Sequence, residues 1–115
     1  MLQTLEKNQN LSLLLQELKV KLQNLYGQRL YALILFGSQA RGEANVDSDI
    51  DIMTVLEDPV NVLTEINRTS DICHYFLNQN GELISIIPTS KSSFLASAIS
   101  LIRVVKKEGI LLWMK

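Results

Sequence analysis

The unbroken apolar run at residues 30–36, LYALILF, constrains the fold more than any other feature. It has the length of a β-strand, and it lacks the alternation of a strand that faces water on one side. A strand of this kind is typical of a sheet that other elements cover on both faces. We therefore expect residues 30–36 to form a central, buried strand.

Apolar spacing predicts a helix before this strand. Asn8 or Asn10 would cap the helix and Gly27 would end it. Its apolar face comprises Leu11, Leu14, Leu15, Leu18, Leu22 and Leu25.

Further strands and helices follow the central strand. The polar stretch 37–48 reads as a loop, and strands are expected at 49–56 and 83–88, the latter stopped by Pro88. Helices are expected at about 60–78 and from Phe94 to Gly109, and residues 110–113 read as a short strand or an apolar tail. This order predicts an α/β (α+β) fold, a small mixed sheet flanked by helices, as a single domain over residues 1–115.

Composition excludes several classes of protein. One cysteine, Cys73, and one histidine, His74, exclude a disulfide framework and a Cys/His zinc site. A formal net charge of −1 argues against strong nucleic-acid binding. No apolar run approaches the roughly 20 residues that span a membrane, and the N-terminus lacks a secretory pattern. We expect a cytoplasmic protein with no membrane contact, an inert, buried Cys73 and a His74 on a helix surface or core edge.

The residues that follow the central strand carry the chemistry. Gly37 permits a turn that a phosphate can approach closely, and the Ser38 hydroxyl adds a donor. Arg41 can neutralise a further phosphate charge. Asp49 and Asp51 alternate onto one face of the next strand, where a divalent cation such as Mg²⁺ or Mn²⁺ would relieve their repulsion. The combination is suited to metal-assisted nucleotidyl transfer.

The same stretch resembles a known signature. Gly37-Ser38, ten residues and Asp49-x-Asp51 are similar to the G-S-x10-D-x-D motif of nucleotidyltransferases of the DNA polymerase β type. The 15-residue GSQARGEANVDSDID resembles GSxARGxxxxxSDxD of the minimal nucleotidyltransferase (MNT) family, small proteins that often act as antitoxins beside HEPN-domain toxins. The C-terminal SLIRVVKKEGILLW also looks like the ending of related small proteins.

The resemblance implies a fold and a set of site residues. The fold would be the nucleotidyltransferase fold, which is similar to the palm of polymerase β. Asp49 and Asp51 would be the catalytic metal ligands, and the nucleotide would be bound by Gly37, Ser38, Arg41 and Ser48.

The chain departs from the family pattern at one position. Active members usually place a third carboxylate on a later strand, where it completes the two-metal site and acts as general base. The matching position in this chain is Ser85, which cannot take that role. Glu82, at the start of the strand, is our hypothesis for a third metal ligand, and Asp71, in a predicted helix, is a poorer substitute.

Two functions follow from the resemblance. The first is an Mg²⁺-dependent enzyme that transfers AMP from ATP to a hydroxyl, such as a tyrosine, of a HEPN-type partner protein. The alternative is a weak or inactive binding module that neutralises this partner by contact alone, as the missing carboxylate favours. A small-molecule transferase of the aminoglycoside-modifying kind ranks lower, because it would carry an additional helical domain. The preferred nucleotide and any homo-oligomer are left open.

Overall fold

A mixed β-sheet forms the centre of the computed structural model, which describes the backbone of residues 2–43 and 49–115 and the side chains of 9–43 and 49–115. Within these residues the strand order is β3-β2-β1-β4. The strands are β1 (Leu30–Phe36), β2 (Ile50–Leu56), β3 (Ile84–Ser90) and β4 (Ile110–Met114). β1 pairs antiparallel with β2 and β4, whereas β2 and β3 are parallel. The predicted mixed sheet is confirmed.

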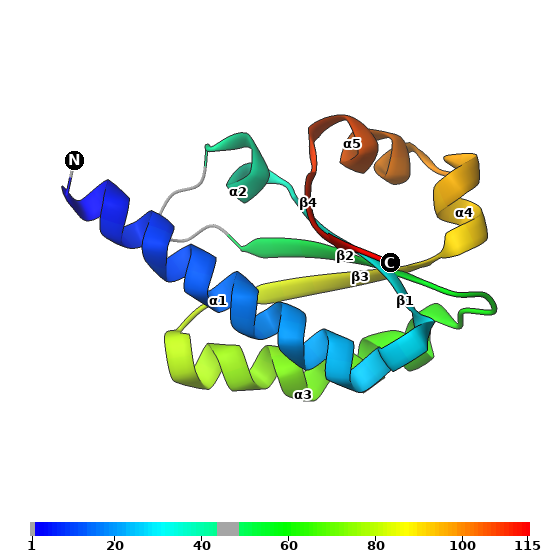
Figure 1. The fold of residues 1–115 in the computed structure, drawn as a ribbon, viewed down its shortest axis with the longest axis horizontal. Coiled ribbons are helices and arrows are strands. Elements are labelled where there is room, and N and C mark those ends of the chain that lie inside the picture. Colours follow the sequence, from blue (N-terminus) through cyan, green and yellow to red (C-terminus); the bar gives the residue numbers. More distant parts are fainter. Residues whose placement is uncertain (1, 44–48) are drawn as a thin grey trace.

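Helices lie on both faces of this sheet (Figure 1). α1 (Leu2–Tyr26) and α3 (Val62–Asn80) cover one face, and a short 3-10 helix (Gly27–Arg29) links α1 to β1. α2 (Ser38–Arg41), α4 (Lys91–Ala96) and α5 (Ser100–Glu108) lie over the other face. None of the helices in the described part of the chain combines the length and the apolar character needed to cross a membrane.

The side chains of β1 and β2 alternate between two cores, which confirms the prediction of a strand covered on both faces. The core on the side of α1 and α3 includes Leu14, Leu18, Leu22, Phe76, Leu33, Leu35, Ile50, Ile52, Ile84 and Ile86. The core on the side of α4 and α5 comprises Ala32, Ile34, Met53, Val55, Phe94, Ile102 and Val105. Each large aliphatic or aromatic side chain buried here contributes about 1.5–3 kcal/mol. Because Ile50 and Ile52 face α1 and α3, Asp51 between them faces the opposite side.

α1 is longer than predicted. It begins at Leu2, so neither Asn8 nor Asn10 is its cap. An asparagine inside a helix costs less than about 1 kcal/mol relative to alanine, and the helix runs through both. The predicted stripe also differs at its end, where Leu25 is 39% exposed and Tyr26 takes the core position.

The boundaries of α3 and β3 differ from the prediction for clear physical reasons. The Asn61 side chain caps α3 by accepting from the Thr64 amide at 3.1 Å, so the helix starts at Val62 rather than at about residue 60. Pro88 does not stop β3, because β3 is an edge strand. The Ile50 amide donates to the Leu83 carbonyl, so alternate residues, Pro88 among them, turn away from β2 and the missing N–H costs no ladder bond.

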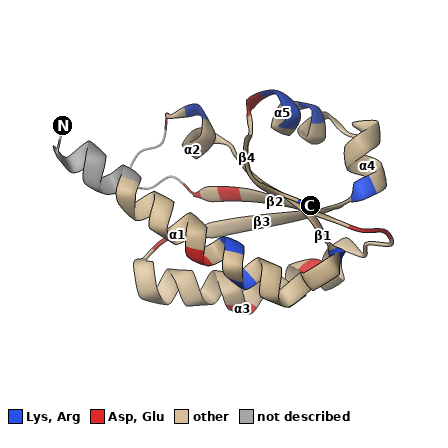
Figure 2. Cartoon of the chain, viewed as in Figure 1, with Lys and Arg blue, Asp and Glu red and all other residues tan. Residues whose placement is uncertain are grey.

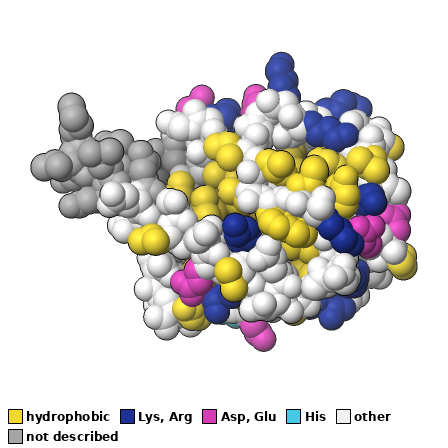
Figure 3. Space-filling model, viewed as in Figure 1, with side chains coloured by type: hydrophobic (Ala, Val, Ile, Leu, Met, Phe, Trp, Pro, Cys, Tyr) yellow, Lys and Arg dark blue, Asp and Glu magenta, His cyan; other side chains and the backbone are white. Residues whose placement is uncertain are grey.

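The C-terminal third contains two helices where one was expected. Ser97 adopts a left-handed conformation (φ 52°) that ends α4, and its amide bonds back to Phe94. The apolar spacing continues across this break, so periodicity alone does not reveal it. Residues 110–114 form a strand: Trp113 packs on the core beside Leu112, and the exposed apolar side chains over β4 are Ile110, Leu111 and Met114 (Figure 3).

Candidate functional site

The turn between β1 and α2 requires a glycine. Gly37 has φ 75° and ψ −157°, which side-chain-bearing residues rarely adopt. A Cβ at this position would collide with Oδ2 of Asp51. The Gly37 carbonyl accepts from the amides of Ala40 and Arg41 at 3.1 and 3.2 Å, which winds residues 38–41 into a single helical turn. This turn corrects the prediction that 37–48 is only a loop, and it places the Gly37 backbone directly against the Asp51 carboxylate.

Sheet register brings the two aspartates to this turn. Asp51 pairs with Phe36, the last residue of β1, and Asp49 immediately precedes β2. Burial raises the pKa of Asp51 above its ordinary value of 3.8, the negative charge of Asp49 raises it further, and Arg41 opposes both effects. Figure 2 shows the acidic start of β2 below the basic end of α2. The two carboxylates and Arg41 thus form one electrostatic unit.

A divalent cation fits this pair of carboxylates. Asp49 raises the pKa of Asp51, which means that the two negative charges repel in the folded chain. A hard cation held by carboxylate oxygens would remove that repulsion. Among the described residues, no three acidic, imidazole or thiol groups are close enough together to hold a metal ion. Within the described ranges, the donor set at this turn therefore consists of the two aspartates.

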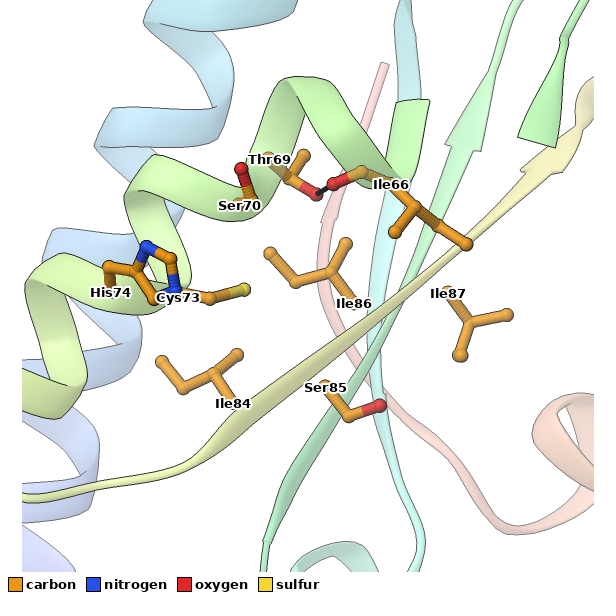
Figure 4. A pocket seen from close by; sticks show the side chains of 9 residues that line it. All are labelled: Ile66, Thr69, Ser70, Cys73, His74, Ile84, Ser85, Ile86 and Ile87. Carbon is orange, nitrogen blue, oxygen red and sulfur yellow. Dashed lines mark hydrogen bonds between the residues drawn. The ribbon is translucent and has the colours of Figure 1, made fainter. Parts of the chain in front are cut away.

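Ser85 occupies the place beside Asp51 on the neighbouring strand. The register pairs Asp51 with Ser85, as expected for the position of the third carboxylate. Figure 4 shows the Ser85 side chain pointing away from α3, on the opposite side of β3 from Ile84 and Ile86. A serine hydroxyl is neutral at pH 7 and cannot replace a carboxylate as ligand and base.

The other acids do not fill this gap. Glu82 lies two residues before β3 and does not complete a group of three with the aspartates. Its role as a ligand stays a prediction, and unchanged Mn²⁺ affinity in Glu82→Gln would remove it. Asp71 is on α3, which covers the other face of the sheet.

A groove of about 310 Å³ follows the open edge of β3 but is not centred on these carboxylates. It is lined on α3 by Ile66, Thr69, Ser70, Cys73 and His74, and on β3 by residues 84–87 (Figure 4). His74 is on the helix surface, as expected. Cys73 is half-buried rather than fully buried, and burial raises the pKa of its thiol, which disfavours the reactive thiolate.

Arg41 is held by two acids that the sequence did not single out. Its Nε donates to Glu43 Oε2 at 3.1 Å, and its Nη1 lies 3.6 Å from Glu108 Oε2. Glu43 lies inside the signature stretch but at a variable position of it. Glu108 is 67 positions away and no sequence signal connects it to Arg41. The remaining predicted residue, Ser48, lies outside the described residues.

Comparisons with known proteins identify relatives of this chain in sequence and in fold. The chain is 34% identical over 73 residues to a Methanocaldococcus jannaschii protein named as a protein adenylyltransferase, which covers 64% of this chain and 67% of the relative. The fold is similar to that of a Sulfolobus solfataricus nucleotidyltransferase (TM-score 0.61, 23% identity, 89% of this chain and 81% of that chain). It is also similar to a chain of a toxin–antitoxin complex with AMP-PNP (TM-score 0.59, 22% identity, 84% of this chain and 70% of that chain).

The family assignment rests on most of the chain. The model of the nucleotidyltransferase domain matches residues 15–112, which include both aspartates, the glycine turn and all four strands through Leu112. Enzymes of this family generally use a nucleoside triphosphate and a divalent metal. The chain belongs to the nucleotidyltransferase domain family.

Proposed function

We propose that this chain transfers AMP from ATP to a hydroxyl group of a partner protein, with Mg²⁺ or Mn²⁺ bound by Asp49 and Asp51. The observation that carries the proposal is the contact of the Gly37 turn with the Asp51 carboxylate. It allows a nucleotide's phosphates and a metal-binding carboxylate to meet at one point. The adenylyl group is proposed because the Methanocaldococcus relative is named for protein adenylyl transfer.

Each site residue has a proposed role. Gly37 and Ser38 bind phosphate oxygens through backbone amides and the hydroxyl, and Arg41 faces the phosphate charge. Ser48 supports the loop, a role that rests on the signature alone. The metal, when bound, neutralises phosphate charge and increases the electrophilicity of the α-phosphorus.

The bonds that form and break at the α-phosphorus indicate which kind of hydroxyl is the best acceptor. The acceptor oxygen forms a bond to the α-phosphorus, the bond from that phosphorus to the bridging oxygen breaks, and pyrophosphate leaves with the electron pair. The acceptor proton goes to water, since the site offers Ser85 in place of a third carboxylate. A phenol, with a pKa of about 10, releases its proton more readily than an aliphatic alcohol. We therefore propose tyrosine as the acceptor.

The proposed partner is a toxin of the HEPN type, in the cytoplasm. Support comes from two observations: similar folds occur in toxin–antitoxin complexes, one of them with AMP-PNP, and the motif resembles that of MNT antitoxins.

Thermal unfolding with and without Mg²⁺·ATP tests the nucleotide site without a partner. A ligand at 100 times its Kd stabilises the folded state by about 2.7 kcal/mol, roughly 10 °C in Tm for a domain of this size. We expect this shift in the wild type and its loss in Asp49→Asn/Asp51→Asn. Absence of a metal-dependent shift in the wild type would contradict the proposal for the free chain.

The alternative, neutralisation by contact alone, is favoured by one observation, the serine at position 85. The two accounts differ in whether the aspartates matter for neutralising the partner. Co-expression of a cognate toxin with Asp49→Asn/Asp51→Asn separates them. Full neutralisation by the double variant would favour contact, and lost neutralisation with retained complex formation would favour transfer.

A further inference from the structure

The end of α5 is fixed on the sheet beside the nucleotide site. Ile102 and Val105 of α5 are buried against β1, at 0% and 1% exposure. Gly109 follows α5 directly, and a Cβ there would lie 2.5 Å from the Val105 carbonyl oxygen and 2.6 Å from Cγ2 of Ile34. Only glycine allows α5 to end this close to β1. The next residue, Ile110, pairs with Leu35, which is two residues before Gly37.

Glu108, the last residue of α5, therefore extends from a rigid base. Its carboxylate reaches the Nη1 of Arg41 at 3.6 Å, and both side chains are about 40% exposed. Glu43, the second acid on Arg41, is 67% exposed, and its amide donates to the Ser38 carbonyl of the short helix α2. Of the two acids, Glu108 is the one whose backbone is anchored in the core.

We propose that Glu108 is a positioning residue of the nucleotide site: it holds the Arg41 guanidinium at the end of α2 so that Arg41 faces the phosphates bound at Gly37 and Ser38. This inference rests on the proposed function, because it requires phosphates at that turn. Arg41 is the group that meets the nucleotide, and Glu108 acts only through it.

Two physical effects of Glu108 have opposite signs, which makes the inference testable. As a bare negative charge near the phosphates, Glu108 would weaken nucleotide binding, and its removal would tighten binding. As the partner that orients Arg41, its removal would weaken binding. Because exposed ion pairs contribute little to folding, Glu108→Gln should leave the fold intact. It removes both effects at once, so the sign of the change in nucleotide affinity shows which of them dominates.

The experiment compares Kd values by isothermal titration with Mg²⁺·AMP-PNP and with AMP for the wild type, Glu108→Gln and Glu108→Lys. Glu57→Gln is the matched control, since Glu57 pairs with Lys91 and Lys115 at the far end of β2. We expect Glu108→Gln to weaken AMP-PNP binding about fivefold and AMP binding less than about twofold. Glu108→Lys should weaken AMP-PNP binding further, because it repels Arg41, and Glu57→Gln should bind as the wild type does.

The outcomes are decisive in each direction. Unchanged or tighter AMP-PNP binding by Glu108→Gln would overturn the positioning role and leave the proposed function intact. Equal losses for AMP-PNP and AMP would also overturn it, since a general distortion of the site does not depend on the number of phosphates. If the wild type fails to bind AMP-PNP with Mg²⁺ present, the proposed function fails, and the role of Glu108 fails with it.

Discussion

Two acidic centres at opposite ends of β2 differ in how the chain compensates their charges: Glu65 is buried, whereas Asp51 is half-buried. Glu65 on α3 is 3% exposed; Arg68 Nε donates to it at 2.8 Å and Arg29 Nη1 lies 3.3 Å away. Burial alone would raise the pKa of Glu65, but Tyr26, Arg68 and Arg29 outweigh burial and lower it. Asp51 has the reverse balance, because burial and Asp49 raise its pKa against a single arginine.

This difference in charge compensation distinguishes a structural centre, Glu65 with its arginines, from a receptive centre, Asp49 and Asp51, which can bind a cation. The charge of Glu65 is already compensated by the chain, so this centre stabilises the fold. The charges of Asp49 and Asp51 are compensated only in part, so binding of a cation between them is energetically favourable. The sign of a carboxylate's pKa shift is therefore more informative here than its burial.

The largest effect should come from breaking the compensated centre. Glu65→Gln leaves two arginines beside a buried neutral group, and we expect a loss of about 2–3 kcal/mol in the free energy of unfolding. Urea denaturation measures this loss. Glu57→Gln, which removes the partly exposed ion pairs with Lys91 and Lys115, should cost less than about 1 kcal/mol. Similar losses in the two variants would mean that Glu65 is not a structural centre.

A smaller loss of stability, with a specific loss of binding, is expected from Gly37→Ala. The substitution combines an unfavourable positive φ with a collision against Asp51, and should cost about 2 kcal/mol and abolish Mg²⁺·AMP-PNP binding. Gly27→Ala is the control, because Gly27 has φ 53° but open space around it. It should cost about 1 kcal/mol and leave binding unchanged. Retained binding in Gly37→Ala would contradict the close-approach argument.

The receptive centre can be made more acidic through Ser85→Asp. A third carboxylate next to Asp51 should tighten Mn²⁺ binding about tenfold and destabilise the metal-free chain by about 1 kcal/mol. Electron paramagnetic resonance titration of Mn²⁺ and unfolding with and without the ion measure both effects. Ser70→Asp adds the same charge on α3 and should not change Mn²⁺ affinity. Unchanged affinity in Ser85→Asp would show that position 85 does not face the cation.

The smallest effect is the opposite pH dependence of the two centres. The pKa of Asp51 in the folded chain lies above the ordinary value of 3.8. Its contribution to the free energy of unfolding therefore grows as pH falls from neutral through the folded pKa. The pKa of Glu65 in the folded chain lies below the ordinary value of 4.5. Its contribution to the free energy of unfolding is therefore fully present above pH 4.5 and is lost as pH falls through the folded pKa. Urea unfolding between pH 7 and 4 should show the wild type gaining stability relative to Asp51→Asn on acidification. The greater stability of the wild type relative to Glu65→Gln should decrease only below about pH 4.5. Parallel curves for the three proteins would remove the distinction.

The sequence predicts the parts of this site that are close together in the chain. The apolar run 30–36, the glycine turn and the alternation at 49–51 are local patterns, and each sets a strand end or a strand face. The position of Ser85 beside Asp51 follows from the resemblance to the family, whose active members place a third carboxylate on a later strand, and the register confirms it.

Other features depend on contacts that local patterns do not encode. The Arg41–Glu108 pair joins residues 67 positions apart, and it exists only because Gly109 lets α5 end against β1. The break at Ser97 interrupts neither apolar spacing nor polarity, since a serine takes the left-handed position where glycine is the usual signal. The compensation of the Glu65 charge requires Arg29, which lies before β1. No local sequence pattern predicts this contact either.

The two edges of the sheet carry different irregularities with a shared consequence. On β3, Pro88 removes one of the outward amide donors. On β4, the register against β1 passes from Trp113 to Leu111, so Leu112 is an extra residue that bends the strand. Both irregularities interrupt the regular row of donors and acceptors that another strand would need. Both edges therefore disfavour strand-to-strand pairing between copies of this chain, even though β4 exposes apolar side chains to water.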